Sequence, residues 1–141
     1  MEIKRVFIDT SAWISYFLEN EPDHEVVDAA FRKLIVEDWG MFTSSDVVDE
    51  TVTRLVYKDQ FIATKKFVKY FQEAMEQRVL VQLWVDDVAQ EEALGLVMRF
   101  YEHRLSLTDA TSIALIKRFK IDVILSLDDD YKKVGMKVLP E

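Results

Sequence analysis

Short runs of β-branched and aromatic residues alternate with segments of helical periodicity along the whole chain. The clearest run covers residues 3–8 and stops on Asp9. Thr10 and Ser11 follow, and their hydroxyl groups suit the start of a helix. Strands that alternate with helices form a parallel sheet whose two faces are both covered. We therefore predict an α/β fold, a three-layer αβα sandwich with a central, mainly parallel sheet.

The same patterns place the remaining elements. Further strands are expected at residues 41–43, 79–84, 123–125 and 137–139. Helices are expected at residues 11–18, 22–38, 45–58, 61–77, 87–101 and 109–119. Thr108 is the expected cap of the last of these helices, and Ser44, Ser45 and Asp46 are candidate caps of the third.

The third helix has a predicted apolar stripe of Val48, Val52, Leu55 and Val56. At about 100° per residue, Glu50 lies about 200° from Val48 and therefore on the opposite side. We expect Glu50 to be free to face a cleft.

Composition restricts the class of protein. The 141 residues are enough to bury a core, and we expect one domain over residues 1–141. Cysteine is absent, which excludes disulfides, thiolate nucleophiles and cysteine-type zinc sites. The chain has neither a signal-peptide pattern nor an apolar run long enough for a membrane, so we expect a cytoplasmic protein.

The net charge of −8 argues against a generic basic nucleic-acid binder. It does not exclude a nucleic-acid substrate, because clustered acids that hold divalent cations reverse the local field where a phosphate would bind.

Four carboxylates stand beside the expected strand ends. Asp9 follows the first strand, Glu50 lies one helical turn beyond the second, and Asp128 follows the fourth. Asp109 opens a helix and shares a row with Ile113 and Ile116. Loops beyond the carboxyl ends of parallel strands converge on one edge, so these acids can meet there.

Acids that repel one another at close range need a reason to be together, and a divalent cation supplies one. Mg²⁺ and Mn²⁺ prefer oxygen ligands and assist in-line displacement at a phosphoryl group, which indicates a phosphodiester substrate. Each acid taken alone also fits a helix cap or a solvated charge, because the chain has 26 acidic residues.

Four segments taken in order carry a family resemblance. They are Phe7-Ile8-Asp9-Thr10-Ser11-Ala12-Trp13, Thr43-Ser44 with Glu50, Leu105-Ser106-Leu107-Thr108-Asp109-Ala110, and Ser126-Leu127-Asp128-Asp129-Asp130-Tyr131. Together they resemble the acidic motifs of PIN-domain nucleases, in particular the short VapC-type toxins of toxin–antitoxin pairs, and the resemblance covers essentially the whole chain.

The resemblance implies a Mg²⁺- or Mn²⁺-dependent ribonuclease. Its metal-binding and catalytic acids would be Asp9, Glu50, Asp109 and Asp128, with Asp130 as an auxiliary ligand. Ser11 and Ser126 would orient Asp9 and the metal waters. The implied partners are RNA, a small antitoxin whose C-terminal segment covers the active-site groove, and a second copy of the chain.

The chain departs from the family pattern at two positions. Tyr131 stands where the family more often has Phe, and Ser126 stands where Thr is common. Neither position is expected to be a ligand, so we do not predict an inactive enzyme.

Two alternatives keep the same fold: an RNA-processing nuclease without an antitoxin, and a non-catalytic interaction module. Other folds fit less well. A haloacid-dehalogenase-type phosphatase needs a second Asp where this chain has Ser11, and a receiver domain needs paired acids near the first strand. The three glycines form no phosphate-cradling loop.

Basic and aromatic residues add little to this interpretation. Lys58, Lys65 and Lys69 could form a phosphate-facing strip, although a solvated helix face is the favoured explanation. Trp13 is assigned to packing. His24 and His103 have no partner at ligand spacing and receive no catalytic role.

Overall fold

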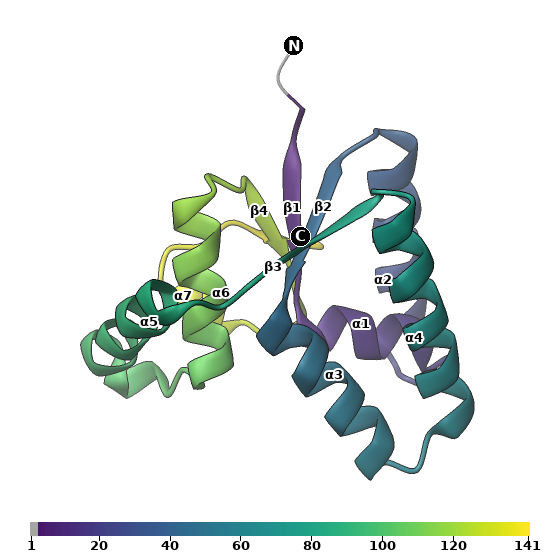
Figure 1. The fold of residues 1–141 in the computed structure, drawn as a ribbon, viewed down its shortest axis with the longest axis horizontal. Coiled ribbons are helices and arrows are strands. Elements are labelled where there is room, and N and C mark those ends of the chain that lie inside the picture. The colour runs from purple at the N-terminus through teal and green to yellow at the C-terminus, as the bar shows by residue number, and fades with distance from the viewer. Residues whose placement is uncertain (1–2) are drawn as a thin grey trace.

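The computed structural model describes residues 3–141. These residues form a parallel β-sheet between two layers of helices (Figure 1). The strands are β1 (Arg5–Ile8), β2 (Gly40–Ser44), β3 (Leu80–Leu83), β4 (Val123–Leu125) and β5 (Val138–Leu139). The helices are α1 (Thr10–Phe17), α2 (His24–Val36), α3 (Ser45–Tyr57), α4 (Phe61–Glu76), α5 (Asp87–Arg99), α6 (Leu107–Arg118) and α7 (Asp130–Lys133), with a 3₁₀ turn η1 (Tyr101–His103) after α5. The predicted αβα sandwich is confirmed.

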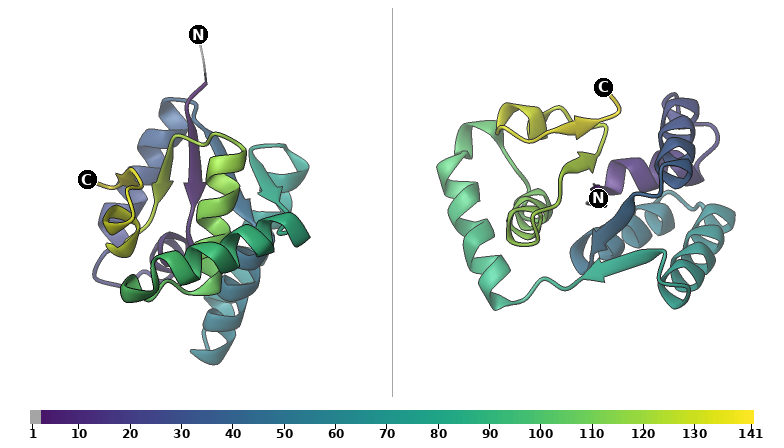
Figure 2. Two further views of the ribbon diagram at one scale, coloured as in Figure 1. Left: turned by 90° about the vertical axis from the view of Figure 1, so that its left-hand side faces the viewer. Right: turned by 90° about the horizontal axis from the view of Figure 1, so that it is seen from above.

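The sheet order is β3-β2-β1-β4-β5, and every neighbouring pair is parallel. The chain first builds outward from β1 to β2 and β3, then returns to the other side of β1 for β4 and β5. Because such crossovers are right-handed, the reversal places the later helices on the opposite face of the sheet. Helices α1, α2 and α4 cover one face, and α5 and α6 cover the other (Figure 2).

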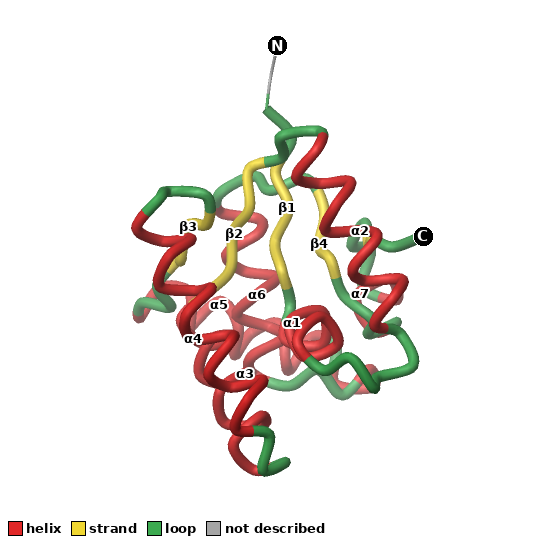
Figure 3. Tube along the Cα trace, turned by 90° about the vertical axis from the view of Figure 1, so that its right-hand side faces the viewer, coloured by secondary structure: helices red, strands yellow, loops and turns green. Residues whose placement is uncertain are grey.

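The reversal creates a topological switch point between β1 and β4, the place where open α/β sheets form their binding crevice. The strands run toward α1, α3 and α6, so these helices surround the carboxyl-end edge of the sheet (Figure 3). Helix α3 packs against α1, α4 and α6 and extends beyond the sheet. Side chains on the loops after β1 and β4 therefore meet beside α6.

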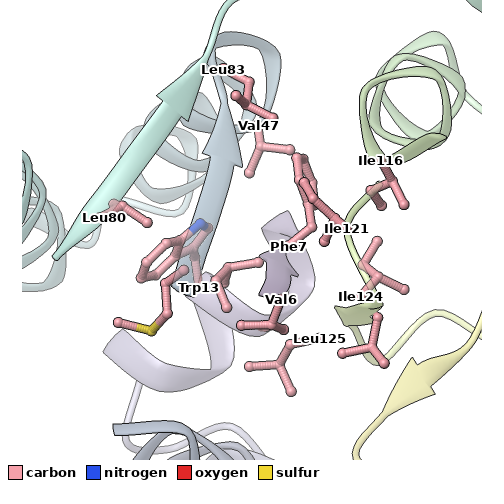
Figure 4. Close-up of a cluster of buried hydrophobic side chains, with 14 of the residues drawn as sticks. Val6, Phe7, Trp13, Val47, Leu80, Leu83, Ile116, Ile121, Ile124 and Leu125 are labelled. Atoms are coloured by element: carbon pink, nitrogen blue, oxygen red, sulfur yellow. The ribbon is translucent and has the colours of Figure 1, made fainter. Parts of the chain in front are cut away.

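The core follows from the alternation of side chains along the strands. Phe7 points toward Ile116 and Ile121 in the layer of α6, while Val6 lies on the side of Trp13 (Figure 4). Trp13 is fully buried and contacts the rings of Phe31 and Phe67. The assignment of Trp13 to packing is confirmed.

Two successive buried hydrogen bonds hold α1 against the first two strands. The indole Nε1 of Trp13 donates to Thr43 Oγ1 at 3.2 Å, and that hydroxyl donates to the carbonyl of Ile8 at 3.0 Å. Thr43 thus satisfies a buried indole and a strand-end carbonyl at once. The carbonyl belongs to the residue immediately before Asp9.

Two local predictions are wrong. Helix α6 begins at Leu107 with Ser106 as its cap, not with Thr108. Ser106 and Asp109 form a reciprocal capping box that satisfies two backbone N–H groups, which a cap at Thr108 would not do.

The buried face of α3 is also displaced from the predicted stripe. Val47, Thr51 and Leu55 are buried, whereas Val56 is 59% exposed. Packing of α3 against three helices, rather than against the sheet alone, decides which face is buried. Among residues 3–141, the structure contains no helix with the length and apolar character of a membrane span.

Candidate active site

Asp9 lies directly after β1, with only 4% of its surface exposed. Its backbone N–H donates to the carbonyl of Leu125 at the end of β4, which holds Asp9 at the switch point. Its Oδ2 atom accepts hydrogen bonds from Ser126 Oγ at 2.8 Å and from Ser11 Oγ at 3.2 Å. The structure thus places a buried carboxylate among hydroxyl donors.

The two serines are themselves oriented by the backbone after β4. Ser11 Oγ accepts the N–H of Leu127 at 2.9 Å, and Ser126 Oγ accepts the N–H of Asp128 at 3.0 Å. Since each hydroxyl then has its proton free for Asp9, the pattern favours Asp9 as an ionised acceptor. The loop after β4 and the loop after β1 are thereby joined.

Asp109 approaches the same place from α6. Its Oδ2 atom accepts the backbone N–H of Ser106 in the capping box. Its Oδ1 atom lies 3.0 Å from the hydroxyl oxygen of Tyr131, and the same hydroxyl lies 3.2 Å from Asp9 Oδ1. Both carboxylates therefore face one tyrosine, and their Oδ1 atoms cannot be farther apart than those two distances combined.

Asp128 and Asp130 lie on the turn that leads into α7. Asp128 Oδ1 accepts the N–H of Asp130 at 2.9 Å, which closes the turn. Asp130 forms an ion pair with Lys133 at 3.4 Å. Burial raises the pKa of Asp128 above its usual value, and the negative charges of Asp109 and Asp130 add to the shift.

Glu50 is set apart from these acids. It lies on α3 and pairs with Arg54 at 3.7 Å, with about a quarter of its side chain exposed. Within residues 3–141, no hydrogen bond or ion pair links Glu50 to Asp9, Asp109 or Asp128.

Asp46 is a residue that the sequence interpretation placed only among cap candidates. Ser44 is the actual cap of α3, and Asp46 instead accepts the hydroxyl of Thr111 on α6 at 3.0 Å. Asp46 lies one turn before Glu50, so the two share a face of α3. The four-residue spacing from Glu50 was the sequence signal that could have placed Asp46 on this face of α3.

The sequence profile of the family described as PIN domain matches residues 6–137, nearly the whole chain. The chain belongs to the PIN-domain family. The resemblance to PIN domains inferred from the acidic segments is therefore confirmed as family membership.

PIN-domain relatives with curated names support the same grouping. A VapC ribonuclease of Archaeoglobus fulgidus is 29% identical over 119 residues, which cover 83% of this chain and 73% of that protein. Ribonuclease VapC26 of Mycobacterium tuberculosis is 29% identical over 137 residues, which cover 87% of this chain and 86% of that protein.

Solved PIN-domain structures show the same fold. VapC20 of Mycobacterium tuberculosis, described as a sarcin-ricin loop cleaving toxin, matches with a TM-score of 0.78 and 23% identity, over 93% of this chain and 95% of that one. A toxin–antitoxin complex from Klebsiella pneumoniae contains a chain that matches with a TM-score of 0.64 and 16% identity, over 96% of this chain and 98% of that one.

The electrostatics at the PIN-domain switch point centre on Asp9. The pKa of Asp9 is raised to about 6, chiefly by burial; the negative charge of Asp109 contributes to the rise, while hydrogen bonds from Ser126 and Tyr131 counteract part of it. The ionised form of Asp9 is therefore destabilised in the absence of a nearby positive charge.

A divalent cation fits this donor set. Mg²⁺ commonly takes one or two carboxylates and keeps several waters, and Asp9 and Asp109 provide two carboxylate oxygens that face one place. Across residues 3–141, no group of three or more acidic or histidine side chains is arranged to hold a metal ion. Asp9 and Asp109 are thus the predicted acids that the structure joins through one side chain, and Asp128 lies near enough for the charge of Asp109 to raise its pKa.

Proposed function

We propose that the protein is a metal-dependent endoribonuclease that hydrolyses RNA phosphodiester bonds and acts as the toxin of a toxin–antitoxin pair. The observation that carries the proposal is a pair of carboxylates held close at the switch point, the buried Asp9 and the half-buried Asp109. Membership of the PIN-domain family and relatives named VapC ribonucleases support the choice of RNA as substrate.

Asp9, Glu50, Asp109 and Asp128 would hold Mg²⁺ or Mn²⁺, with Asp130 as an auxiliary ligand. When bound, such a cation stabilises negative charge on the phosphoryl group and lowers the pKa of a coordinated water. Ser126 and Ser11 hold Asp9 Oδ2, which leaves Oδ1 facing the Tyr131 hydroxyl that also contacts Asp109. Glu50 would join from α3 after leaving its partly exposed pair with Arg54.

A small antitoxin and a second copy of the chain are the proposed protein partners. A chain in a toxin–antitoxin complex shares this fold, which supports the first of them. An arginine from such a partner would be attracted to the acidic pair. Large apolar side chains are exposed around the junction of α3 and α4, a feature common in interaction surfaces; they are Val56, Tyr57, Phe61, Ile62 and Val68.

The test is an RNA cleavage assay on protein purified natively and then separated from any small bound protein. We expect cleavage with Mn²⁺ or Mg²⁺, none with EDTA, and none with Asp9→Asn. Asp129→Asn is the matched control, because Asp129 is an exposed acid on the loop that carries Asp128 and makes no side-chain cap.

Two outcomes would overturn the proposal. Equal cleavage by Asp9→Asn and the parent protein would mean that the site lies elsewhere. A folded parent protein that cleaves no RNA with either cation would instead indicate a non-catalytic module.

A further inference from the structure

Tyr131 is the largest side chain at the candidate site and lies in the first turn of α7, with none of its surface exposed. Its hydroxyl is 3.2 Å from Asp9 Oδ1 and 3.0 Å from Asp109 Oδ1. Burying a hydroxyl is unfavourable unless it forms hydrogen bonds. A phenylalanine would fill nearly the same volume, so packing alone does not explain this hydroxyl.

The other oxygen of each carboxylate is held by its own surroundings. Asp9 Oδ2 accepts from Ser126 and Ser11, and Asp109 Oδ2 accepts from the N–H of Ser106. These contacts leave both Oδ1 atoms turned toward Tyr131. Among the described residues, Tyr131 is the side chain that forms hydrogen bonds with both acids.

The position of Tyr131 joins three distant parts of the chain: the end of β1, the start of α6 and the turn into α7. Asp9 is buried and Asp109 is half-buried, so water screens their repulsion only in part, and without a donor between them the two carboxylates would turn apart. The tyrosine hydroxyl offsets part of this repulsion, because it can donate its single proton to either carboxylate oxygen. It therefore keeps both Oδ1 atoms aimed at one place when no cation is bound.

We propose that Tyr131 is a positioning residue, whose hydroxyl sets the spacing and direction of the Asp9 and Asp109 oxygens that receive a divalent cation. The inference rests on the proposed function, because it concerns the metal site assigned there. It adds a residue that is not itself a ligand. The hydroxyl prepares the pair before the cation arrives, so its loss should weaken metal binding.

The first experiment measures Mn²⁺ binding to the metal-free protein, by electron paramagnetic resonance of the free ion. We expect Tyr131→Phe to raise the Kd for Mn²⁺ about tenfold, equivalent to about 1.4 kcal/mol. Tyr70→Phe is the matched control: it removes a tyrosine hydroxyl from the aromatic cluster around Trp13 and should leave the Kd unchanged. Far-UV circular dichroism checks that both variants are folded.

A second measurement starts with the parent protein and uses the same two variants to assign the signal. Mg²⁺ added to the parent protein should change the near-ultraviolet absorption of a tyrosine, because the hydrogen bonds of Tyr131 change when the acids bind a cation. The other tyrosines have no hydrogen bond to either acid; they are Tyr16, Tyr57, Tyr70 and Tyr101. The signal should persist in Tyr70→Phe and disappear in Tyr131→Phe.

The outcomes separate the two proposals. If the parent protein binds Mn²⁺ and Tyr131→Phe binds it with the same Kd, the positioning role is wrong and the proposed function stands. If the parent protein binds no Mn²⁺, the proposed metal site is wrong, and the role of Tyr131 falls with it. A parent protein that binds Mg²⁺ with no tyrosine difference signal also contradicts the positioning role.

Discussion

The acids of this molecule lie in two unlike regions. At the switch point, Asp9 and Asp109 are held by hydroxyl and backbone N–H donors, and Asp9 is almost entirely buried. On α3, Glu50 is partly exposed and pairs with Arg54 at a long 3.7 Å. The first region has its geometry fixed in advance, whereas the second can adjust to what binds. This contrast predicts different sensitivities to substitution.

The largest difference should appear in catalysis. We expect Asp109→Asn to lower kcat/KM for RNA about 10³-fold, because it removes a charge aimed at the cation site. Glu50→Gln should lower it only about 10- to 100-fold, because Glu50 must first leave Arg54. Single-turnover cleavage at saturating Mn²⁺ measures both effects. Asp49→Asn is the control for α3, since Asp49 is an exposed acid beside Glu50. Equal losses in the two variants would contradict the contrast between a fixed switch point and an adjustable Glu50.

The next largest effect concerns stability without metal. The pKa of Asp9 in the folded chain is about 6, above its ordinary value of 3.8, so the folded state binds this proton more tightly than the unfolded state. The resulting stabilisation is complete below about pH 4 and is lost as pH rises through about 6. Asp9→Asn removes this dependence and should stabilise the metal-free protein by about 1 kcal/mol more at pH 8 than at pH 5.

Urea unfolding in EDTA at the two pH values measures this difference. Asp129→Asn provides the reference, because it removes an exposed charge from a neighbouring loop. A stability difference between Asp9→Asn and the parent protein that is the same at both pH values would show that Asp9 does not titrate as a buried acid.

The smallest effects separate the contacts of the two regions. Ser126→Ala removes a donor to buried Asp9 and an acceptor of the Asp128 N–H, and should lower the free energy of unfolding by about 1–2 kcal/mol. Arg54→Ala breaks an exposed ion pair and should change it by less than about 0.5 kcal/mol. Chemical unfolding at pH 7 compares them. A larger loss from Arg54→Ala would mean that α3 is as firmly held as the switch point.

The sheet and the position of Asp9 could be predicted because both follow from local pattern. Strand-like residues that end on Asp9, and strands alternating with helices, leave few arrangements of the chain. Asp109 was also identifiable, because an acid at the start of a helix was aligned with core positions.

Other features depend on contacts between distant residues and had no local signal. The hydroxyl of Tyr131 reaches two acids that lie more than twenty positions earlier in the chain, which no spacing rule reveals. The contact between Asp46 and Thr111 depends on how α3 packs on α6. The cap of α6 was predicted at the wrong residue because Ser106 and Thr108 are both good caps, and the reciprocal bond with Asp109 decides between them.

The hydrogen-bonded chain from Trp13 through Thr43 to the carbonyl of Ile8 also acts against misfolding. A slip of one residue between β1 and β2 would turn Thr43 to the other face of the sheet and leave the indole N–H unsatisfied in the core. Such a defect costs about 1–3 kcal/mol, in addition to the misplaced apolar side chains. One threonine on the neighbouring strand thus favours the native register of β1 over a slipped one. It thereby also fixes the position of Asp9 at the end of that strand.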